Sequence, residues 1–375
     1  RQLLLGSLII LVLGFKELGG WDEMMRVCGA VTVNDYGDTM TNLIRSNDDA
    51  NFPWLGALIG SAIIGFWYWC TDQFIVQRVL SGKNEMEARR GTIFGAYLKL
   101  LPVFLFLIPG MIAFALHQKY IGAGGEGFLP MLENGTANAD AAFPTLVAKL
   151  LPAGVKGLVV CGILAALMSS LASLFNSSAM LFTIDFYKRF RPQTSEKKLV
   201  GIGQVATVVI VILGILWIPI MRSVGDVLYT YLQDVQSVLA PGIAAAFLLG
   251  ICWKRTSAQG GMWGLISGMV IGLTRLGAKV YYSNAGEVAD STFKYLFYDM
   301  NWLFFCGWMF LFCIIVVIVV SLATEAPTAE KIQGLVFGTA TKEQKASTRA
   351  SWNHWDIIHT VIILAITGAF YWYFW

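Results

Sequence analysis

The chain has 375 residues, of which 56% are apolar and 14% charged, and its mean hydropathy is +0.63. A soluble domain of this size carries about a quarter charged residues, so the composition indicates a membrane protein and excludes an ordinary soluble domain. The net charge of +3 identifies no partner, because the Lys and Arg residues sit in short connections. The six Cys residues have no paired spacing and fall mostly in apolar stretches, which indicates core positions rather than a disulfide or metal framework.

The apolar stretches are long enough to cross a hydrocarbon core of about 30 Å as α-helices. They predict an all-α polytopic membrane protein with about nine spans, at 3–18, 53–80, 92–117, 155–187, 199–221, 226–254, 258–278, 299–323 and 353–375. Lys and Arg are about twice as frequent in one alternate set of connections, 81–91, 188–198, 254–257 and 324–352. The positive-inside rule therefore predicts that the other long connections lie outside, at 19–52, 118–154 and 279–298.

The chain opens at Arg1 inside an apolar run and not at a Met, so we expect that N-terminal helices of the protein are missing from it. No Gly-rich phosphate loop or metal-ligand cluster appears in the sequence, and the three His residues are scattered. We therefore expect no enzyme, no cofactor and no nucleic-acid partner.

The span 53–80 holds an aromatic run, Phe66-Trp67-Tyr68-Trp69, followed by Cys70-Thr71-Asp72-Gln73. Tyr68 lies about fifteen residues into the span, near the bilayer midplane. Aromatic faces stack on sugar rings while polar neighbours bind hydroxyls, so the run suits a carbohydrate pocket. Ordinary packing, with Asp72 paired to Arg78, is an equally open alternative at this point.

Lys99 lies about 13 Å above Arg90 along the next span, near the bilayer centre. A central Lys costs about 2.5–3.5 kcal/mol to insert unless it faces a wet cavity or a partner. Snorkelling to the interface is the alternative, and the depth favours the cavity.

The span 155–187 carries small residues at high density around Ser169 and Ser170. Such density is typical of close helix packing. The competing interpretation is that hydroxyl and carbonyl oxygens coordinate a hard cation such as sodium.

In the span 226–254, Gln233 lies about two turns inside the outer face, where its amide can donate to and accept from sugar hydroxyls. The pair Pro241-Gly242 predicts a break in this helix, and interrupted helices are common at transporter binding sites.

Together these segments resemble the sodium/glucose cotransporter branch of the solute:sodium symporter family. The resemblance covers nearly the whole chain and is carried by Gly19-Gly20-Trp21, Trp67-Tyr68-Trp69-Cys70-Thr71-Asp72-Gln73, Ile75-Val76-Gln77-Arg78, Tyr97-Leu98-Lys99-Leu100, Pro109-Gly110-Met111-Ile112, Met168-Ser169-Ser170-Leu171, Phe175-Asn176-Ser177, Ala244-Ala245-Ala246-Phe247-Leu248-Leu249 and Trp253-Lys254-Arg255. It implies a bacterial-type transporter truncated at its N-terminus. It also implies a core of two inverted five-helix repeats with sites where helices are broken.

The resemblance assigns roles to individual residues. Tyr68 corresponds to an aromatic that stacks beneath the sugar and closes the inner gate, with Trp69 beside it. Lys99 and Gln233 correspond to side chains that bind sugar hydroxyls, and Tyr229 to an aromatic of the outer gate.

Half of a sodium site is implied at the carbonyl of Ala166 and the hydroxyls of Ser169 and Ser170. Two positions depart from the family. Gly65 stands where many members have a polar sugar-binding side chain, so that contact is lost or replaced by water. Ala172 replaces a hydroxyl found in members that couple two sodium ions, which favours one sodium ion per sugar.

The expected function is symport of sodium with a hexose such as glucose or galactose, by alternating access in the inner or plasma membrane. The alternatives are a sodium/myo-inositol or other polyol symporter, and a solute-sensing membrane domain of a signalling protein. We expect residues 1–257 to hold six core spans and residues 258–375 three peripheral spans, with a cytoplasmic linker near 324–352. The expected partners are sodium, a monosaccharide, the bilayer and the missing N-terminal helices, which transport would need.

Overall fold

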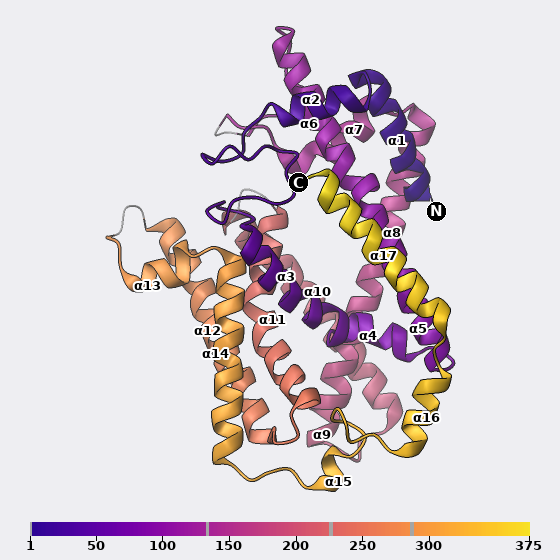
Figure 1. The fold of residues 1–375 in the computed structure, drawn as a ribbon, viewed down its shortest axis with the longest axis vertical. Helices are drawn as coiled ribbons and strands as arrows, with labels where there is room; N and C mark the ends of the chain where they lie inside the picture. The colour runs from indigo at the N-terminus through magenta and orange to yellow at the C-terminus, as the bar shows by residue number, and fades with distance from the viewer. Residues whose placement is uncertain (1, 133–134, 225–227, 286–288) are drawn as a thin grey trace. The chain divides into compact units, whose positions relative to one another are not determined.

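The computed structural model describes residues 2–132, 135–224, 228–285 and 289–375, and these form helices joined by turns (Figure 1). The only extended pairings among them are three isolated β-bridges, so the all-α prediction is confirmed. Two compact units can be separated, and each is described by itself. Unit 1 comprises Arg1–Asn42, Phe94–Arg222 and Phe374, and unit 2 comprises Leu43–Ile93, Ser223–Tyr373 and Trp375. The expected division into a core at 1–257 and a peripheral part at 258–375 stays a prediction.

Eight of the nine predicted spans correspond to helices, or pairs of helices, that are long and apolar enough to cross a membrane. Six are single stretches and two are bent pairs, among the described residues. The six stretches are Glu85–Gly122, Ala153–Phe190, Glu196–Pro219, Leu228–Cys252, Trp302–Ala323 and His354–Tyr373. The ninth prediction, 258–278, forms helix α12 (Ala258–Asn284) but is not among these eight, because polar and charged residues lower its hydropathy.

The two bent pairs break for different local reasons. Helices α1 (Gln2–Leu18) and α2 (Trp21–Gly29) meet at 75° across Gly19 and Gly20. Both glycines have φ near +110°, which a residue with a Cβ rarely adopts. Helices α3 (Trp54–Cys70) and α4 (Gln73–Leu80) meet at 50° across Thr71 and Asp72, so the predicted single span 53–80 is a broken helix.

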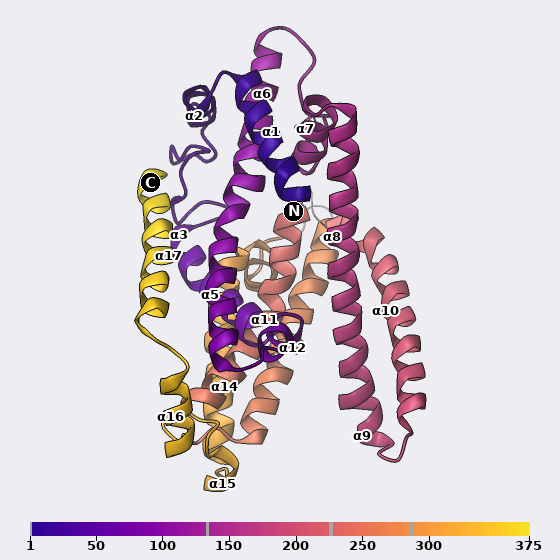
Figure 2. The ribbon, with the colours of Figure 1, turned by 90° about the vertical axis from the view of Figure 1, so that its right-hand side faces the viewer.

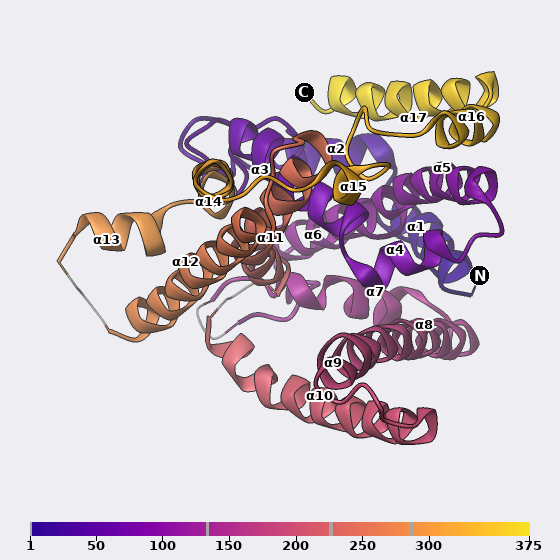
Figure 3. The ribbon, with the colours of Figure 1, turned by 90° about the horizontal axis from the view of Figure 1, so that it is seen from below.

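In unit 1, α5 (Glu85–Pro102, which enters this unit at Phe94) continues through a π-helical turn, η1 (Val103–Leu107), into α6 (Ile108–Gly122). Pro109 has no N–H to donate and its ring crowds the carbonyl four residues earlier, which favours the wider turn there. Helix α8 (Ala153–Met180) continues through η3 (Leu181–Tyr187) and α9 (Lys188–Phe190). A short turn joins α9 to α10 (Glu196–Val224), and Figures 2 and 3 show α10 beside α8.

Unit 2 is organised around α11 (Leu228–Cys252), which packs against α3, α12 and α14 (Trp302–Ala323) (Figure 3). The break predicted at Pro241-Gly242 is wrong, because α11 runs unbroken through both residues. Pro241 and Gly242 are buried, and the Gly242 backbone lies against Gly268 of α12. Neighbouring helices hold the backbone around a proline in a membrane helix, so this residue pair serves close packing and not a break.

The remaining helices are short ones in the connections and the last membrane span. They are η2 (Ala139–Ala141), α7 (Ala142–Leu150), α13 (Thr292–Lys294), η4 (Tyr295–Asp299), α15 (Ala329–Ile332), α16 (Lys342–Ala350) and the last span α17 (His354–Tyr373).

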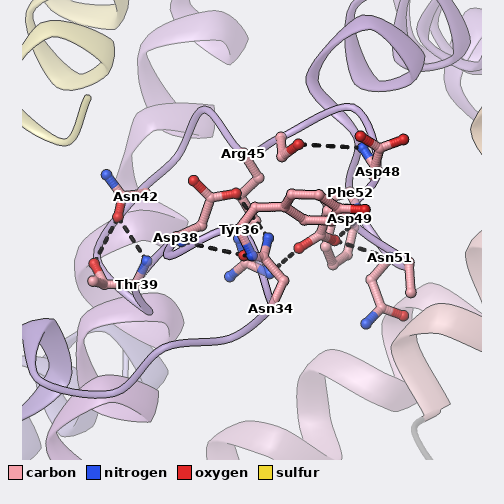
Figure 4. A network of polar contacts seen from close by, with 12 residues as sticks. Asn34, Tyr36, Asp38, Thr39, Asn42, Arg45, Asp48, Asp49, Asn51 and Phe52 are labelled. Carbon is pink, nitrogen blue, oxygen red and sulfur yellow. Dashed lines mark hydrogen bonds and ion pairs between the residues drawn. The ribbon is translucent and has the colours of Figure 1, made fainter.

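Between α2 and α3 the chain is held in tight turns by side chains of Asn and Asp (Figure 4). In unit 1, the Asn34 amide oxygen accepts hydrogen bonds from the backbone N–H groups of Tyr36 and Asp38. In unit 2, the Asp49 carboxylate accepts from the N–H groups of Asn51 and Phe52. These contacts are the local turns that Asn and Asp favour.

Candidate functional site

The break between α3 and α4 is built from the polar residues that follow the aromatic run. The Trp67 carbonyl accepts hydrogen bonds from the Thr71 hydroxyl (2.7 Å) and from the N–H groups of Thr71 and Asp72. Asp72 is extended, and its Oδ1 accepts from the Phe74 N–H at 3.1 Å. Its carboxylate therefore caps the first turn of α4, which is why a new helix begins there.

The alternative role for Asp72, a pair with Arg78, is not found among the ion pairs of the described residues. The Arg78 guanidinium lies over the Phe74 ring, 4.7 Å from its centroid.

Tyr68 stands between two tryptophans in the last turn of α3. Its ring centroid lies 5.3 Å from that of Trp69, edge to face, and 6.2 Å from that of Trp67. Tyr68 is half-buried, whereas 45% of Trp69 is exposed. The aromatic run thus ends one helix at a break, with ring surface still accessible.

Helix α3 is fixed by close contact with α14. A Cβ on Gly60 would lie 2.9 Å from the Leu303 carbonyl oxygen, so only glycine permits this approach. The Cys306 thiol donates to the Gly60 carbonyl at 3.8 Å. Trp67 packs on the same buried cluster, which also contains Ala240 and Ala244 of α11. The aromatic end of α3 is therefore attached to a rigid group of helices.

Gln233 lies near the start of α11, in the same unit as Tyr68. The side chain is half-buried, and no hydrogen bond to its amide occurs within the described part of the chain. Tyr229, one turn earlier, is 58% exposed, whereas Tyr231, two residues after Tyr229, is 6% exposed. Gln233 can therefore offer donors and acceptors to a ligand without breaking an internal bond.

Lys99 lies in unit 1, one turn before the π-helical segment η1. Its side chain is exposed within that unit, and it lies on the span Glu85–Gly122. Such π-helical turns are frequent at functional sites.

The predicted sodium ligands lie on one face of α8, also in unit 1. Ala166, Ser169 and Ser170 stand at positions i, i+3 and i+4, and all three are exposed. Ser173 continues this face and its hydroxyl donates to the Ser169 carbonyl at 3.1 Å. Among the described residues, the hydroxyls of Ser169 and Ser170 take part in no hydrogen bond.

The predicted site residues thus fall into two groups. Tyr68, Trp69, Gln233 and Tyr229 belong to unit 2, and Lys99 with the three α8 positions belongs to unit 1. The unit 2 residues lie on two packed helices, α3 and α11. The three predicted sodium ligands lie on α8, and Lys99 lies on another helix of unit 1, α5. Their roles remain predictions.

A charged cluster in unit 2 was missed by the sequence interpretation. Asp234, the residue after Gln233, lies between Arg275 and Lys279 of α12. The signal that could have indicated it is a pair of basic residues four apart, Arg275 near the end of the predicted span 258–278 and Lys279 directly after it.

A model of the sodium:solute symporter family matches residues 2–268. The chain belongs to the sodium:solute symporter family. Its relatives place it in the sugar cotransporter branch, so it is part of a multi-pass plasma-membrane protein.

Three curated relatives are each 35% identical to the chain. A sodium/mannose cotransporter of Bos taurus is similar over 98% of this chain and 65% of the relative. The sodium/myo-inositol cotransporter 2 of Homo sapiens is similar over 90% of this chain and 52% of the relative. The sodium/glucose cotransporter 4 of Mus musculus is similar over 89% of this chain and 50% of the relative. The chain therefore spans about half to two thirds of the length of these relatives.

Proposed function

We propose that the protein containing this chain couples the inward flow of sodium to the uptake of a hexose such as glucose or galactose. The observation that carries the proposal is the aromatic end of α3, where Tyr68 and Trp69 precede a break in a membrane helix. A half-buried aromatic ring beside a break offers an apolar face to a sugar ring. Freed backbone groups at the break can bind its hydroxyls.

The Gln233 amide supplies matching polar groups on a helix packed against α3. An amide can donate to one hydroxyl and accept from another, which suits a polyhydroxylated ligand. The family resemblance assigns Lys99 a hydrogen bond to a sugar hydroxyl and Tyr229 a place in the outer gate.

The sodium half of the proposal rests on α8. Exposed hydroxyls on a membrane helix are unfavourable against lipid, so Ser169 and Ser170 need a polar partner. Together with the carbonyl of Ala166, whose second lone pair is available inside a helix, they form a neutral oxygen set. Neutral oxygen ligands hold a monovalent cation weakly enough to release it.

One sodium ion supplies enough free energy for strong accumulation. Crossing a potential of 100 mV contributes about 2.3 kcal/mol per ion. A tenfold concentration gradient adds about 1.4 kcal/mol, and together these support a sugar accumulation of roughly a few hundredfold. Sodium binding from outside would stabilise the outward-open state and order the sugar site, and its release inside would free the inner gate.

The test is uptake of labelled sugar by the full-length protein in proteoliposomes. We expect uptake to require sodium, and Ser170→Ala to raise the sodium concentration for half-maximal uptake about tenfold. Ser178→Ala is the matched control, because Ser178 lies on another face of α8, and it should change this value less than twofold. Uptake that persists when choline replaces sodium, or that Ser170→Ala leaves unchanged, contradicts the coupling.

A second substrate class is favoured by one observation, since the myo-inositol relative is as similar to the chain as the glucose relative. Competition of labelled glucose with unlabelled galactose, mannose and myo-inositol separates these substrates. A solute sensor would bind the sugar without accumulating it, so the same uptake assay distinguishes it from a symporter.

A further inference from the structure

Three charged side chains meet between α11 and α12 in unit 2. The Lys279 ammonium lies 2.6 Å from Asp234 Oδ2, and the Arg275 guanidinium lies 3.4 Å from Asp234 Oδ1. The Arg275 side chain is fully buried, and the Asp234 side chain is 13% exposed. One carboxylate therefore faces two cations in a position almost closed to solvent.

Arg275 also reaches the connection before α14. Its guanidinium donates to the Met300 carbonyl at 2.7 Å and to the Leu296 carbonyl at 3.3 Å. It lies over the Phe305 ring, 4.1 Å from the centroid. The Arg275 side chain thus joins α11, α12 and the segment that leads into α14.

The cluster continues a tightly packed seam between α11 and α12. At Gly268 a Cβ would lie 2.9 Å from the Gly242 Cα, and at Gly272 it would collide with the Val238 carbonyl oxygen. Asp234 stands one turn before Val238 on the same face of α11, and Arg275 follows Gly272 on α12. The close contacts of this seam hold α11 and α12 side by side, and the charged cluster lies at one end of the seam.

Gln233 is the residue next to Asp234, so its side chain projects about 100° further around the helix. Fixing the Asp234 carboxylate at two points against α12 therefore fixes the direction in which Gln233 leaves α11. Buried charges are costly to separate from their partners, so the cluster resists rotation of this helix end more strongly than apolar contacts do.

We propose that Asp234, held by Arg275 and Lys279, is a positioning residue that orients the Gln233 amide toward the sugar. This inference rests on the proposed function. Loosening the cluster lets Gln233 sample other directions, which weakens sugar binding but leaves the sodium ligands on α8 unchanged.

The experiment measures sodium-dependent uptake of labelled sugar by the full-length protein and its variants, with Tm recorded for each. Asp234→Asn should raise the KM for sugar about tenfold and change the maximal rate and the half-saturating sodium concentration less than twofold. Asp234→Glu, which keeps the charge, should recover KM to within about threefold of the wild-type value.

Two further variants keep the test decisive. Asp234→Asn leaves two cations without an anion, so Asp234→Asn combined with Lys279→Gln restores the net charge of the cluster and should still raise KM. Asp290→Asn breaks an exposed pair with Lys294 in the same unit and should leave KM unchanged.

Coupling to Gln233 is measured in a Gln233→Ala background, where Asp234→Asn should raise KM no further. Two outcomes overturn this inference but not the proposed function. One is that the two substitutions raise KM additively, and the other is that Asp234→Asn leaves KM unchanged while the wild type transports. A wild type without sodium-dependent uptake overturns the proposed function, and this inference with it.

Discussion

The two predicted half-sites stand on helices with very different surroundings. In unit 2, 39% of the most apolar stretch of α11 is buried, and the same fraction holds for α14. In unit 1, the corresponding stretch of α8 is only 11% buried. The proposed sugar residues of unit 2, Tyr68 and Gln233, are thus supported by packed neighbours within their unit. The proposed sodium residues lie on an exposed face of α8. Substitutions near Tyr68 and Gln233 should therefore affect folding as well as binding, and substitutions of the exposed residues Ser169 and Ser170 on α8 should affect binding alone.

The strongest test of this comparison is a glycine in the packed seam. Gly268→Leu would push side-chain atoms into the Gly242 backbone and the Cys313 thiol, and we expect the full-length protein to lose most of its folded yield. Gly261→Leu, on the same helix but with no atom within 4 Å of the added Cβ, is the control. Size-exclusion profiles of detergent extracts distinguish the two, and equal profiles would contradict the packed seam.

Removal of the Tyr68 ring should give the next largest effect. Tyr68→Ala removes the apolar surface proposed to stack on the sugar, which is about 1.5–3 kcal/mol or a roughly 10- to 100-fold rise in KM. Tyr68→Phe keeps that surface, and its KM should stay within about threefold of the wild-type value. An equal rise in KM in both variants would show that the Tyr68 hydroxyl, and not stacking of its ring, contributes to sugar binding.

Removal of the Asp72 cap of α4 should have a smaller effect than removal of the Tyr68 ring. Asp72→Ala removes the acceptor for the Phe74 N–H and should lower stability by about 0.5–2 kcal/mol, with a corresponding fall in Tm. Asp72→Asn retains an acceptor oxygen and should remain near the wild-type Tm. If both variants matched the wild type, the break would not depend on this cap.

These local features show where sequence reasoning succeeded. Apolar stretches predicted the helices because a run of 18 or more apolar residues is long enough to cross the membrane. Within the hydrocarbon core, a helix satisfies the backbone N–H and C=O groups of such a run internally. The break at Thr71-Asp72 was missed because an N-cap inside an apolar run is a short signal, although Asp at that position is a cap residue. The opposite error occurred at Pro241, where tertiary packing of small residues holds a continuous helix.

The candidate site was less predictable than the fold. The aromatic run and the serine face could be located from residue types, but their partners depend on which helices pack together. Asp234 illustrates this limit, because its partners lie 41 and 45 residues later on α12. Only the packing of α11 on α12 brings these three charges together.

The smallest effect is expected at the exposed pair of Asp290 and Lys294. The hydrogen bond from Lys294 lowers the pKa of the Asp290 carboxyl below its usual range. A depressed pKa contributes stability above the unfolded pKa, and this contribution is lost as pH falls through the folded pKa. Because both groups are on the surface, Asp290→Asn should shift Tm by less than about 1 °C at neutral pH. A loss of several degrees would show that the pair is structural.

The central claim is that a sodium gradient drives sugar uphill, and the steady-state accumulation ratio tests it most directly. Proteoliposomes with the full-length protein are given a tenfold inward sodium gradient and an interior-negative potential of about 100 mV, conditions that supply about 3.7 kcal/mol per ion. The account predicts that sugar accumulates far above its outside concentration and that the accumulated sugar leaves when an ionophore collapses the gradient. Sugar that only equilibrates across the membrane, with or without the gradient, would contradict it.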